Sequence, residues 1–259
     1  MTAKTAELAA LMEAAAELAR LTGAVALQHF RRGVAVHLKP DGSPVTEADR
    51  RAERAARDWI EERFSADGIL GEELGERPGS SGRRWLLDPI DGTKTFIRGV
   101  PLWGSLVAVL EGDQVTAGAA SFPAVDEHLV AAPGQGCWHN GTRCNVSSVS
   151  VLRESAVLTT DPNEFSGGRR SAWERLAGEA GLVRTWGDCY GYLLVATGRA
   201  EVMIDPRMNP WDAACLLPIV EEAGGRITDW AGRVTAFGGS TIATNGALAE
   251  VVREQLRSE

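Results

Sequence analysis

The sequence has little of the material from which zinc, redox and histidine-based sites are built. Its 259 residues include only four cysteines and four histidines. No two cysteines form a C-x-x-C pair, so a zinc ribbon or a redox motif is not indicated and we expect buried free thiols. The histidines are scattered and lie outside the aspartate-rich segments. Carboxylates must therefore carry any chemistry that the chain performs.

Positive charge and long apolar runs are also scarce. Lys and Arg total 27 against 35 Asp and Glu, a formal net charge of -8, which argues against binding to nucleic acid or an anionic membrane. No window approaches the roughly 20 apolar residues of a membrane span. The Ala- and Leu-rich N-terminal run is interrupted by glutamates and lacks the basic start and cleavage site of a signal peptide. We expect a cytoplasmic protein.

The first half of the chain predicts two helices followed by strands. Apolar residues at helical spacing indicate a first helix within residues 5–30, and Thr46 is a good N-cap for a second helix. From Trp85 to about Val146, apolar runs broken by turn residues predict a β-meander. Asn140-Gly141 in this region is typical of a hairpin turn.

The second half alternates strands and helices, which favours an α/β layer. One helix is expected from Pro210 to a stop at Gly224, with a strand after it. The fold class is therefore α/β, with an α+β first half. We expect two tightly packed subdomains, residues 1–146 with most of the candidate ligands and residues 147–259, and a site in their shared cleft.

The stretch WLLDPIDGT, residues 85–93, contains two aspartates three positions apart. In a tight turn the Asp88 and Asp91 carboxylates and the Ile90 carbonyl can face one point. Oxygen donors without His or Cys suit Mg²⁺, Mn²⁺ or Ca²⁺. Gly92 and Thr93 can open a helix, whose free N–H groups favour a phosphate. An ordinary turn followed by a helix cap explains the same residues.

Three further acidic motifs are ambiguous when each is taken alone. Glu72 and Glu73 are adjacent, as solvated surface glutamates often are. Asp212 lies in the first turn of an expected helix, where an acid complements the helix dipole. Asp49 follows Thr46 at capping-box spacing. None of these motifs identifies a site by itself.

Taken together and in this order, the motifs resemble the signature of a known family. The segments are GEE at residues 71–73, WLLDPIDGT at 85–93, and WDAA with EEAGG at 211–214 and 221–225. They are similar to those of the inositol monophosphatase family, magnesium-dependent and lithium-sensitive phosphomonoesterases, and the resemblance covers nearly the whole chain. It implies a layered αβαβα sandwich, a homodimer, and two or three Mg²⁺ ions between the subdomains, with Mn²⁺ as a possible substitute.

The resemblance also implies metal-binding roles at matching positions. Glu72, Asp88 and the Ile90 carbonyl would bind the first metal. Asp88, Asp91 and Asp212 would bind the second, so that Asp88 bridges the two. Metals about 3.5 to 4 Å apart can activate water on one side and stabilise the leaving oxygen on the other.

The remaining roles implied by the resemblance concern water and phosphate. Asp49 and Thr93 match the pair that orients the attacking water, which makes them catalytic together with Glu72. Glu73 would be a supporting acid near the more weakly held metal. The amides of Gly92 and Thr93 would hold the phosphate of a small phosphate ester.

Two departures from the inositol phosphatase pattern bear on the substrate. Lys94-Thr95 stands where those enzymes commonly have Thr-Asn, and Asp188 stands where they typically have a small residue. Asp205 matches an acid that contacts the polyol in those enzymes. Two carboxylates facing a neutral ring would be costly, and a cationic ester removes that cost.

We therefore expect L-histidinol phosphate as the substrate. The segment from Trp186 to Pro206 also resembles the matching stretch of the histidinol-phosphate phosphatases of this family, which implies a role in histidine biosynthesis. An N-cap role for Asp188 on the following helix stays open.

Other readings are kept as alternatives. The ester could be inositol 1-phosphate, fructose 1,6-bisphosphate or 3'-phosphoadenosine 5'-phosphate, and a different class would be a non-catalytic metal- and phosphate-binding regulator. A nucleotide-dependent kinase or dehydrogenase is not indicated, because the P-loop and G-x-G-x-x-G motifs are missing from the sequence. Lone cations are usually solvated, so Lys39, Lys94 and Arg184 are left out of the site.

Overall fold

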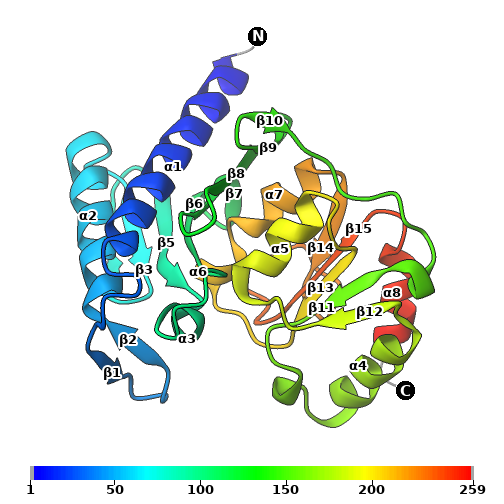
Figure 1. The fold of residues 1–259 in the computed structure, drawn as a ribbon. Coiled ribbons are helices and arrows are strands. Elements are labelled where there is room, and N and C mark those ends of the chain that lie inside the picture. The colour runs from blue at the N-terminus through cyan, green and yellow to red at the C-terminus, as the bar shows by residue number, and fades with distance from the viewer. Residues whose placement is uncertain (1–2, 258–259) are drawn as a thin grey trace.

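The chain folds into five alternating layers of helices and strands (Figure 1). The computed structural model describes residues 3–257. From one side to the other, the layers are α1 with α2, a large sheet, α5 to α7, a small sheet, and α4 with α8. The helices are α1 Ala3–Leu27, α2 Glu47–Arg63, α3 Thr93–Phe96, α4 Gly167–Glu179, α5 Asp188–Ala196, α6 Pro210–Ala213, α7 Leu216–Glu222 and α8 Ala249–Leu256.

The large sheet has eight strands in the order β10-β9-β8-β7-β6-β5-β3-β4. Its neighbours pair antiparallel except for the parallel pair β3 and β5. The strands are β3 Gly68–Gly71, β4 Gly75–Arg77, β5 Arg83–Asp91, β6 Gly104–Glu111, β7 Gln114–Phe122, β8 Glu127–Ala132, β9 Gly136–His139 and β10 Thr142–Arg143.

The small sheet has five strands in the order β12-β11-β13-β15-β14, and a separate hairpin precedes α2. The strands of the small sheet are β11 Ala156–Leu158, β12 Leu182–Arg184, β13 Val202–Asp205, β14 Gly225–Thr228 and β15 Thr241–Asn245. The hairpin consists of β1 Val36–Leu38 and β2 Pro44–Thr46.

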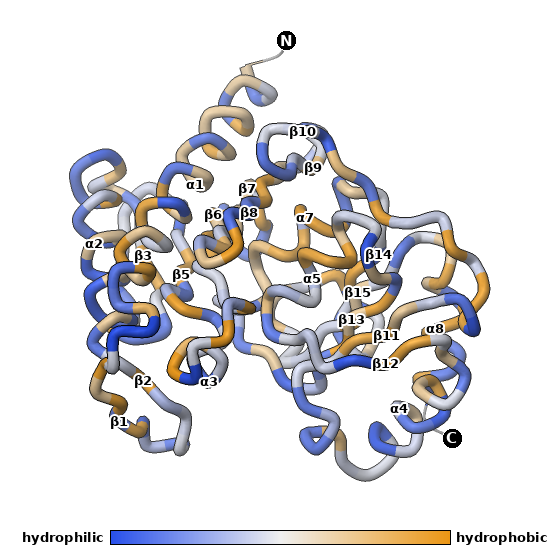
Figure 2. Tube along the Cα trace, viewed as in Figure 1, coloured by the Kyte–Doolittle hydropathy of each residue, from blue (hydrophilic) through white to orange (hydrophobic). Residues whose placement is uncertain are grey.

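Strands β5 and β13 are each covered on both faces. This explains why apolar residues follow one another in Trp85–Leu87 and Val202–Ile204. Side chains alternate between the faces of a strand. In β5, Trp85 and Leu87 pack in the core under α1 and α2, whereas Leu86 joins the core between the two sheets. In β13, Met203 enters that middle core, and Ile204 packs with the helices of the outer layer. The expected layered sandwich is confirmed, and Figure 2 shows hydrophobic segments concentrated in its inner strands and in α7.

Several element predictions are confirmed, and others differ for identifiable reasons. Thr46 caps α2 through a capping box with Asp49. The expected single helix from Pro210 is wrong: it divides into α6 and α7. Pro218 lacks the N–H that would bond four residues back, and its ring clashes with that carbonyl, so a continuous helix is unfavourable there. Strand β5 continues beyond Asp88, with an irregular register up to Asp91.

The hairpin β1–β2 has no counterpart in the sequence-based expectation. Within residues 3–257, none of the helices has the length and apolarity needed to cross a bilayer. The four chain-end residues of the expected division into residues 1–146 and 147–259 lie outside the described part of the chain.

Glu53 of α2 fixes the loop that follows β3. Its side chain is fully buried and pairs with Arg57, with a shortest N to O distance of 2.8 Å. Its carboxylate accepts hydrogen bonds from the backbone N–H groups of Glu73, at 2.8 Å, and Leu74, at 3.2 Å. A Cβ at Gly71 would lie 2.0 Å from Glu53 Oε1, so the close approach requires glycine. Glu53 therefore positions the segment that carries Glu72 and Glu73.

We expect Glu53→Ala to lower the free energy of unfolding by about 3 kcal/mol, because Arg57 loses its buried partner and two backbone donors lose their acceptor. Urea denaturation measures this change. Glu47→Ala is the matched control, since Glu47 pairs with Arg51 on the same helix but both side chains are about half exposed. The loss in the control should be much smaller, because the Glu47 carboxylate is solvated. Equal losses in the two variants would contradict a special role for Glu53.

Candidate active site

A cleft of about 410 Å³ opens where elements from the two halves of the chain meet. Its walls come from the end of β5, the short helix α3, the start of α5, the end of β13 and the segment leading into α6. Nine of the expected site residues line it: Glu72, Asp88, Ile90, Asp91, Gly92, Thr93, Asp188, Asp205 and Asp212.

Three carboxylates converge at the inner end of this cleft. Asp88, Asp91 and Asp212 each offer a carboxylate oxygen, and these oxygens lie within 4.8 Å of one another. A backbone N–H fixes one oxygen of each group. Asp88 Oδ1 accepts from its neighbour Ile90 at 3.0 Å, and Asp212 Oδ2 accepts from Asn209 at 2.8 Å. Asp91 Oδ2 accepts from the backbone N–H of Cys189, the second residue of α5.

Burial and mutual repulsion make this group unstable as free anions. Burial raises the pKa of Asp88 well above its ordinary value, and the nearby charges of Glu72, Asp91 and Asp212 raise it further. Burial likewise raises the pKa of Asp91, with Asp188 adding to the effect. The pKa of Asp212 rises to about 7, mainly because it is buried. Oxygen-only donors with excess negative charge fit a hard divalent cation, which would neutralise them.

Glu72 and Glu73 extend this negative region. Glu72 lies close enough to Asp88 to raise its pKa. Lys39, which follows β1, bridges the two glutamates with Nζ to Oε1 distances of 2.7 Å each. Burial alone would lower the pKa of Lys39, but its bonds to both carboxylates outweigh this and raise it. Lys39 was not among the expected site residues, because the sequence around a single lysine does not indicate which acids it pairs with.

Asp49 and Thr93 are in contact, as the sequence predicted. Asp49 is fully buried behind the cleft wall, and its Oδ2 accepts from the N–H and the hydroxyl of Thr46, at 2.8 and 2.6 Å. The Thr93 hydroxyl lies 3.3 Å from Asp49 Oδ1 and 3.0 Å from the Ile90 carbonyl oxygen. One hydroxyl has a single proton to donate, so only one of these bonds forms at a time. Asp49 therefore caps α2 and also contacts Thr93, the residue with which it was expected to act.

Asp188 and Asp205 are held by a shared partner, Thr160. The Asp188 N–H donates to the Thr160 hydroxyl at 2.8 Å, and the Thr160 N–H donates to Asp205 Oδ1 at 3.0 Å. The Tyr192 hydroxyl also donates to Asp205 Oδ2 at 2.9 Å. Burial raises the pKa of Asp205 to about 6 and raises that of Asp188 as well. Thr160 was not predicted, because its role depends on chain segments that only the fold brings together.

Asp188 is not an N-cap. The cap of α5 is Gly187, and Asp188 is the first helical residue, with a left-handed φ of 49°. Its Oδ2 accepts from the Thr95 hydroxyl at 3.1 Å. A Cβ at Gly92 would lie 3.0 Å from the same oxygen. Asp188 therefore lies beside Gly92 and Thr95, nearer to the turn that carries Asp88 and Asp91 than its expected contact with the organic group of the substrate suggested.

Lys94 and Arg184, which were also not expected at the site, lie in different places. Lys94 lines the cleft, and its charge lowers the pKa of Asp188 against the larger effect of burial. Arg184 lies with its guanidinium carbon 6.0 Å from the Trp186 ring centre, outside the residues that line the cleft. The cleft has a further cation, Arg207, which pairs with Glu164 at 2.9 Å. These two residues carried no sequence signal.

Comparison with known proteins agrees with this geometry. The model of the inositol monophosphatase family matches residues 7–259. The chain is 43% identical to a histidinol-phosphatase of Chlorobaculum parvum, covering 92% of this chain and 93% of the relative. It is 39% identical to a histidinol-phosphatase of Mycobacterium tuberculosis, covering 96% of each chain. A solved inositol monophosphatase from Zymomonas mobilis superposes with a TM-score of 0.86 at 31% identity, covering 99% of each chain. The chain belongs to the inositol monophosphatase family.

Proposed function

We propose that this protein is a Mg²⁺-dependent phosphomonoesterase that hydrolyses L-histidinol phosphate to L-histidinol and phosphate, a step of histidine biosynthesis. The main support for this choice of substrate is the charge of the residues that line the outer part of the cleft. Two of the family relatives, at 43% and 39% identity, are named histidinol-phosphatases, which supports the same substrate.

Negative charge prevails in the part of the cleft that would receive the organic group. Four carboxylates line this part, Asp161, Glu164, Asp188 and Asp205, whereas Lys94 and Arg207 are its cations. Glu164 offsets Arg207, which leaves an excess of acid. Asp188 and Asp205 accept hydrogen bonds but form no ion pair within residues 3–257, and a cationic group would compensate their charge. An ester that carries an ammonium group and an imidazole fits this part of the cleft better than a neutral polyol does.

The inner carboxylates supply the metal sites. Glu72, Asp88 and the Ile90 carbonyl would hold one Mg²⁺, and Asp88, Asp91 and Asp212 would hold a second. When bound, Mg²⁺ supplies Lewis-acid activation of water and stabilisation of the leaving oxygen. Glu73 supports the first site through its shared contact with Lys39.

Asp49 and Thr93 would orient the attacking water. If the Ile90 carbonyl oxygen binds a cation instead of accepting from Thr93, the Thr93 hydroxyl donates to Asp49 Oδ1, which lies 3.3 Å away. The lone pairs of the Thr93 oxygen are then free to accept a hydrogen bond from the attacking water, with Asp49 fixing the direction of the hydroxyl. The amides of Gly92 and Thr93, at the start of α3, would hold the phosphate.

The two subdomains, residues 1–146 and 147–259, would close around the ester. In this proposal Asp91 comes from the first and Asp212 from the second, so the metal site joins them. A cytoplasmic location and a homodimer stay predictions from the sequence and the resemblance.

We expect Mg²⁺ to raise the thermal midpoint, because a ligand that binds only the folded state stabilises it by about 2.7 kcal/mol at 100 times its Kd. Asp91→Asn should raise the midpoint without Mg²⁺, since one repelling charge is removed, and should lose most of the Mg²⁺ effect. Differential scanning calorimetry measures both changes. Asp113→Asn, in the exposed β6–β7 turn, is the control and should keep the full Mg²⁺ effect. A normal Mg²⁺ effect in Asp91→Asn would mean that the ligands are misassigned.

We expect phosphate release in Mg²⁺ to be fastest with L-histidinol phosphate. A colorimetric assay against inositol 1-phosphate, fructose 1,6-bisphosphate and 3'-phosphoadenosine 5'-phosphate tests the choice of substrate. EDTA should abolish turnover of all four esters, because the carboxylates alone cannot activate water. A preference for inositol 1-phosphate would overturn the substrate, and turnover that resists EDTA would overturn the chemistry.

We expect Asp188→Asn to raise KM for L-histidinol phosphate by about tenfold or more, the equivalent of one lost charge contact of about 1.4 kcal/mol. KM for inositol 1-phosphate should change by less than about threefold, because that ester has no cation to lose. Steady-state kinetics with both esters measures the difference. An equal rise for the two would show that Asp188 positions the phosphate end, where it contacts Thr95, rather than recognising charge.

A further inference from the structure

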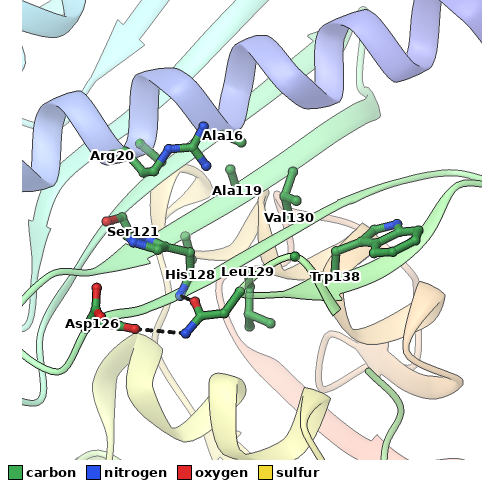
Figure 3. Close-up of a pocket in the computed structure, with 13 residues that line it drawn as sticks. Ala16, Arg20, Ala119, Ser121, Asp126, His128, Leu129, Val130 and Trp138 are labelled. Atoms are coloured by element: carbon green, nitrogen blue, oxygen red, sulfur yellow. Dashed lines mark hydrogen bonds between the residues drawn. The ribbon is translucent and has the colours of Figure 1, made fainter. Parts of the chain in front are cut away.

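A second cavity, of about 380 Å³, lies between α1 and strands β7, β8 and β9 of the large sheet. Figure 3 shows Arg20 reaching from α1 over the strands that carry Ala119, Ser121 and His128, with Trp138 on the far side. The residues that line this cavity and those that line the catalytic cleft do not overlap. The cavity is therefore separate from the proposed reaction site.

Polar groups in this cavity lack partners. The Ser121 side chain is 1% exposed, and its hydroxyl has no hydrogen-bond partner within residues 3–257. The same holds for the buried Nδ1 of His128. Arg20 makes no ion pair with any described residue, although its charge reaches the His128 ring. Arg20 itself is exposed. Buried polar groups almost always have a partner, so the two buried groups, Ser121 Oγ and His128 Nδ1, indicate a missing one beside the unpaired guanidinium.

The rest of the cavity is fixed in shape. The Asn140 side chain accepts from the His128 N–H at 2.8 Å and donates to the Asp126 carbonyl at 2.9 Å, as the dashed lines of Figure 3 show. The Trp138 indole N–H donates to the Gln135 carbonyl at 3.0 Å. These bonds connect β8 with the turn after β9. The alanines on α1 and β7 leave the space that larger side chains would fill.

The chemistry of the lining favours a monoanion. Arg20 is the one lysine or arginine among the described residues that line the cavity, and the Asp126 carboxylate lines it too. Burial lowers the pKa of His128, and Arg20 lowers it further, so the ring is neutral and offers one N–H and one acceptor. One guanidinium can hold a carboxylate through two parallel bonds. A dianionic phosphate would meet too little positive charge.

We propose that this cavity binds a small carboxylate, with Arg20 and Ser121 as donors to the carboxylate group and Trp138 and Val130 against its apolar body. The site does not rest on the proposed reaction, because none of its residues takes part in the chemistry of the cleft.

Benzoate is a suitable probe, because benzamide has the same shape without the charge and phenylphosphonate carries up to two charges. The indole N–H signal of Trp138 in ¹⁵N-labelled, Mg²⁺-loaded protein reports on the cavity and is assigned with Trp138→Phe. We expect benzoate to shift this signal saturably in the millimolar range that suits so small a ligand. Benzamide and phenylphosphonate should bind about tenfold more weakly.

Three variants and a control complete the test. Arg20→Gln should weaken benzoate binding about tenfold, and Ser121→Ala should weaken it severalfold. Ala16→Leu should abolish it by filling the space. Lys4→Gln removes the same charge from the other end of α1 and should change nothing.

Four results would overturn the proposal. Equal binding of benzoate and benzamide, or full binding in Arg20→Gln, would reveal only an apolar hollow. Tighter binding of phenylphosphonate would indicate a phosphate site instead. No shift of the Trp138 signal with benzoate would mean that water molecules are the hydrogen-bond partners of the unpaired groups.

Discussion

Repulsion among buried carboxylates is the constraint on which the site depends. Asp88, Asp91 and Asp212 bring their oxygens within 4.8 Å of one another, although each would be more stable apart. Each is held in place by a bond from a backbone N–H to one of its oxygens, as Ile90 holds Asp88 at 3.0 Å. The folding free energy of the rest of the chain maintains this arrangement, so the ligands are preorganised and a cation relieves the repulsion.

The fold supplies those backbone donors from different layers. Asp88 and Asp91 end a strand of the large sheet, whereas the N–H groups that hold Asp91 and Asp212 belong to the start of α5 and the residue before α6. These helices form the middle layer and pack against both sheets. The site geometry is therefore set by the core between the sheets. Close packing also explains Gly92, whose φ of 86° and contact with Asp188 leave no room for a side chain.

The sequence was sufficient where one local interaction decides the structure. The alternation of strands and helices predicted the α/β class, and the spacing of Thr46 and Asp49 predicted the start of α2, because periodicity and capping act within a few residues; the five layers were implied by the family resemblance. It could not decide whether Asp49 caps a helix or lies at the site, since the same carboxylate caps α2 and contacts Thr93. Lys39 and Thr160 were missed because their partners lie more than 25 residues away in the chain. Pro218 is a helix breaker that the sequence does show, although the predicted helix runs through it.

The charge distribution along the cleft determines which ester can be accommodated in a productive orientation. With cations bound, the inner end would attract a phosphate, while Asp161, Asp188 and Asp205 would make the outer end attract a positive group. An ester with a negative and a positive end is thus aligned at both ends. A polyol phosphate is aligned only at the phosphate. A bisphosphate would place its second phosphate against carboxylates, and Arg207 cannot compensate, because Glu164 already neutralises it. Selection among esters in this cleft therefore depends on charge at the outer end more than on the shape of the ring.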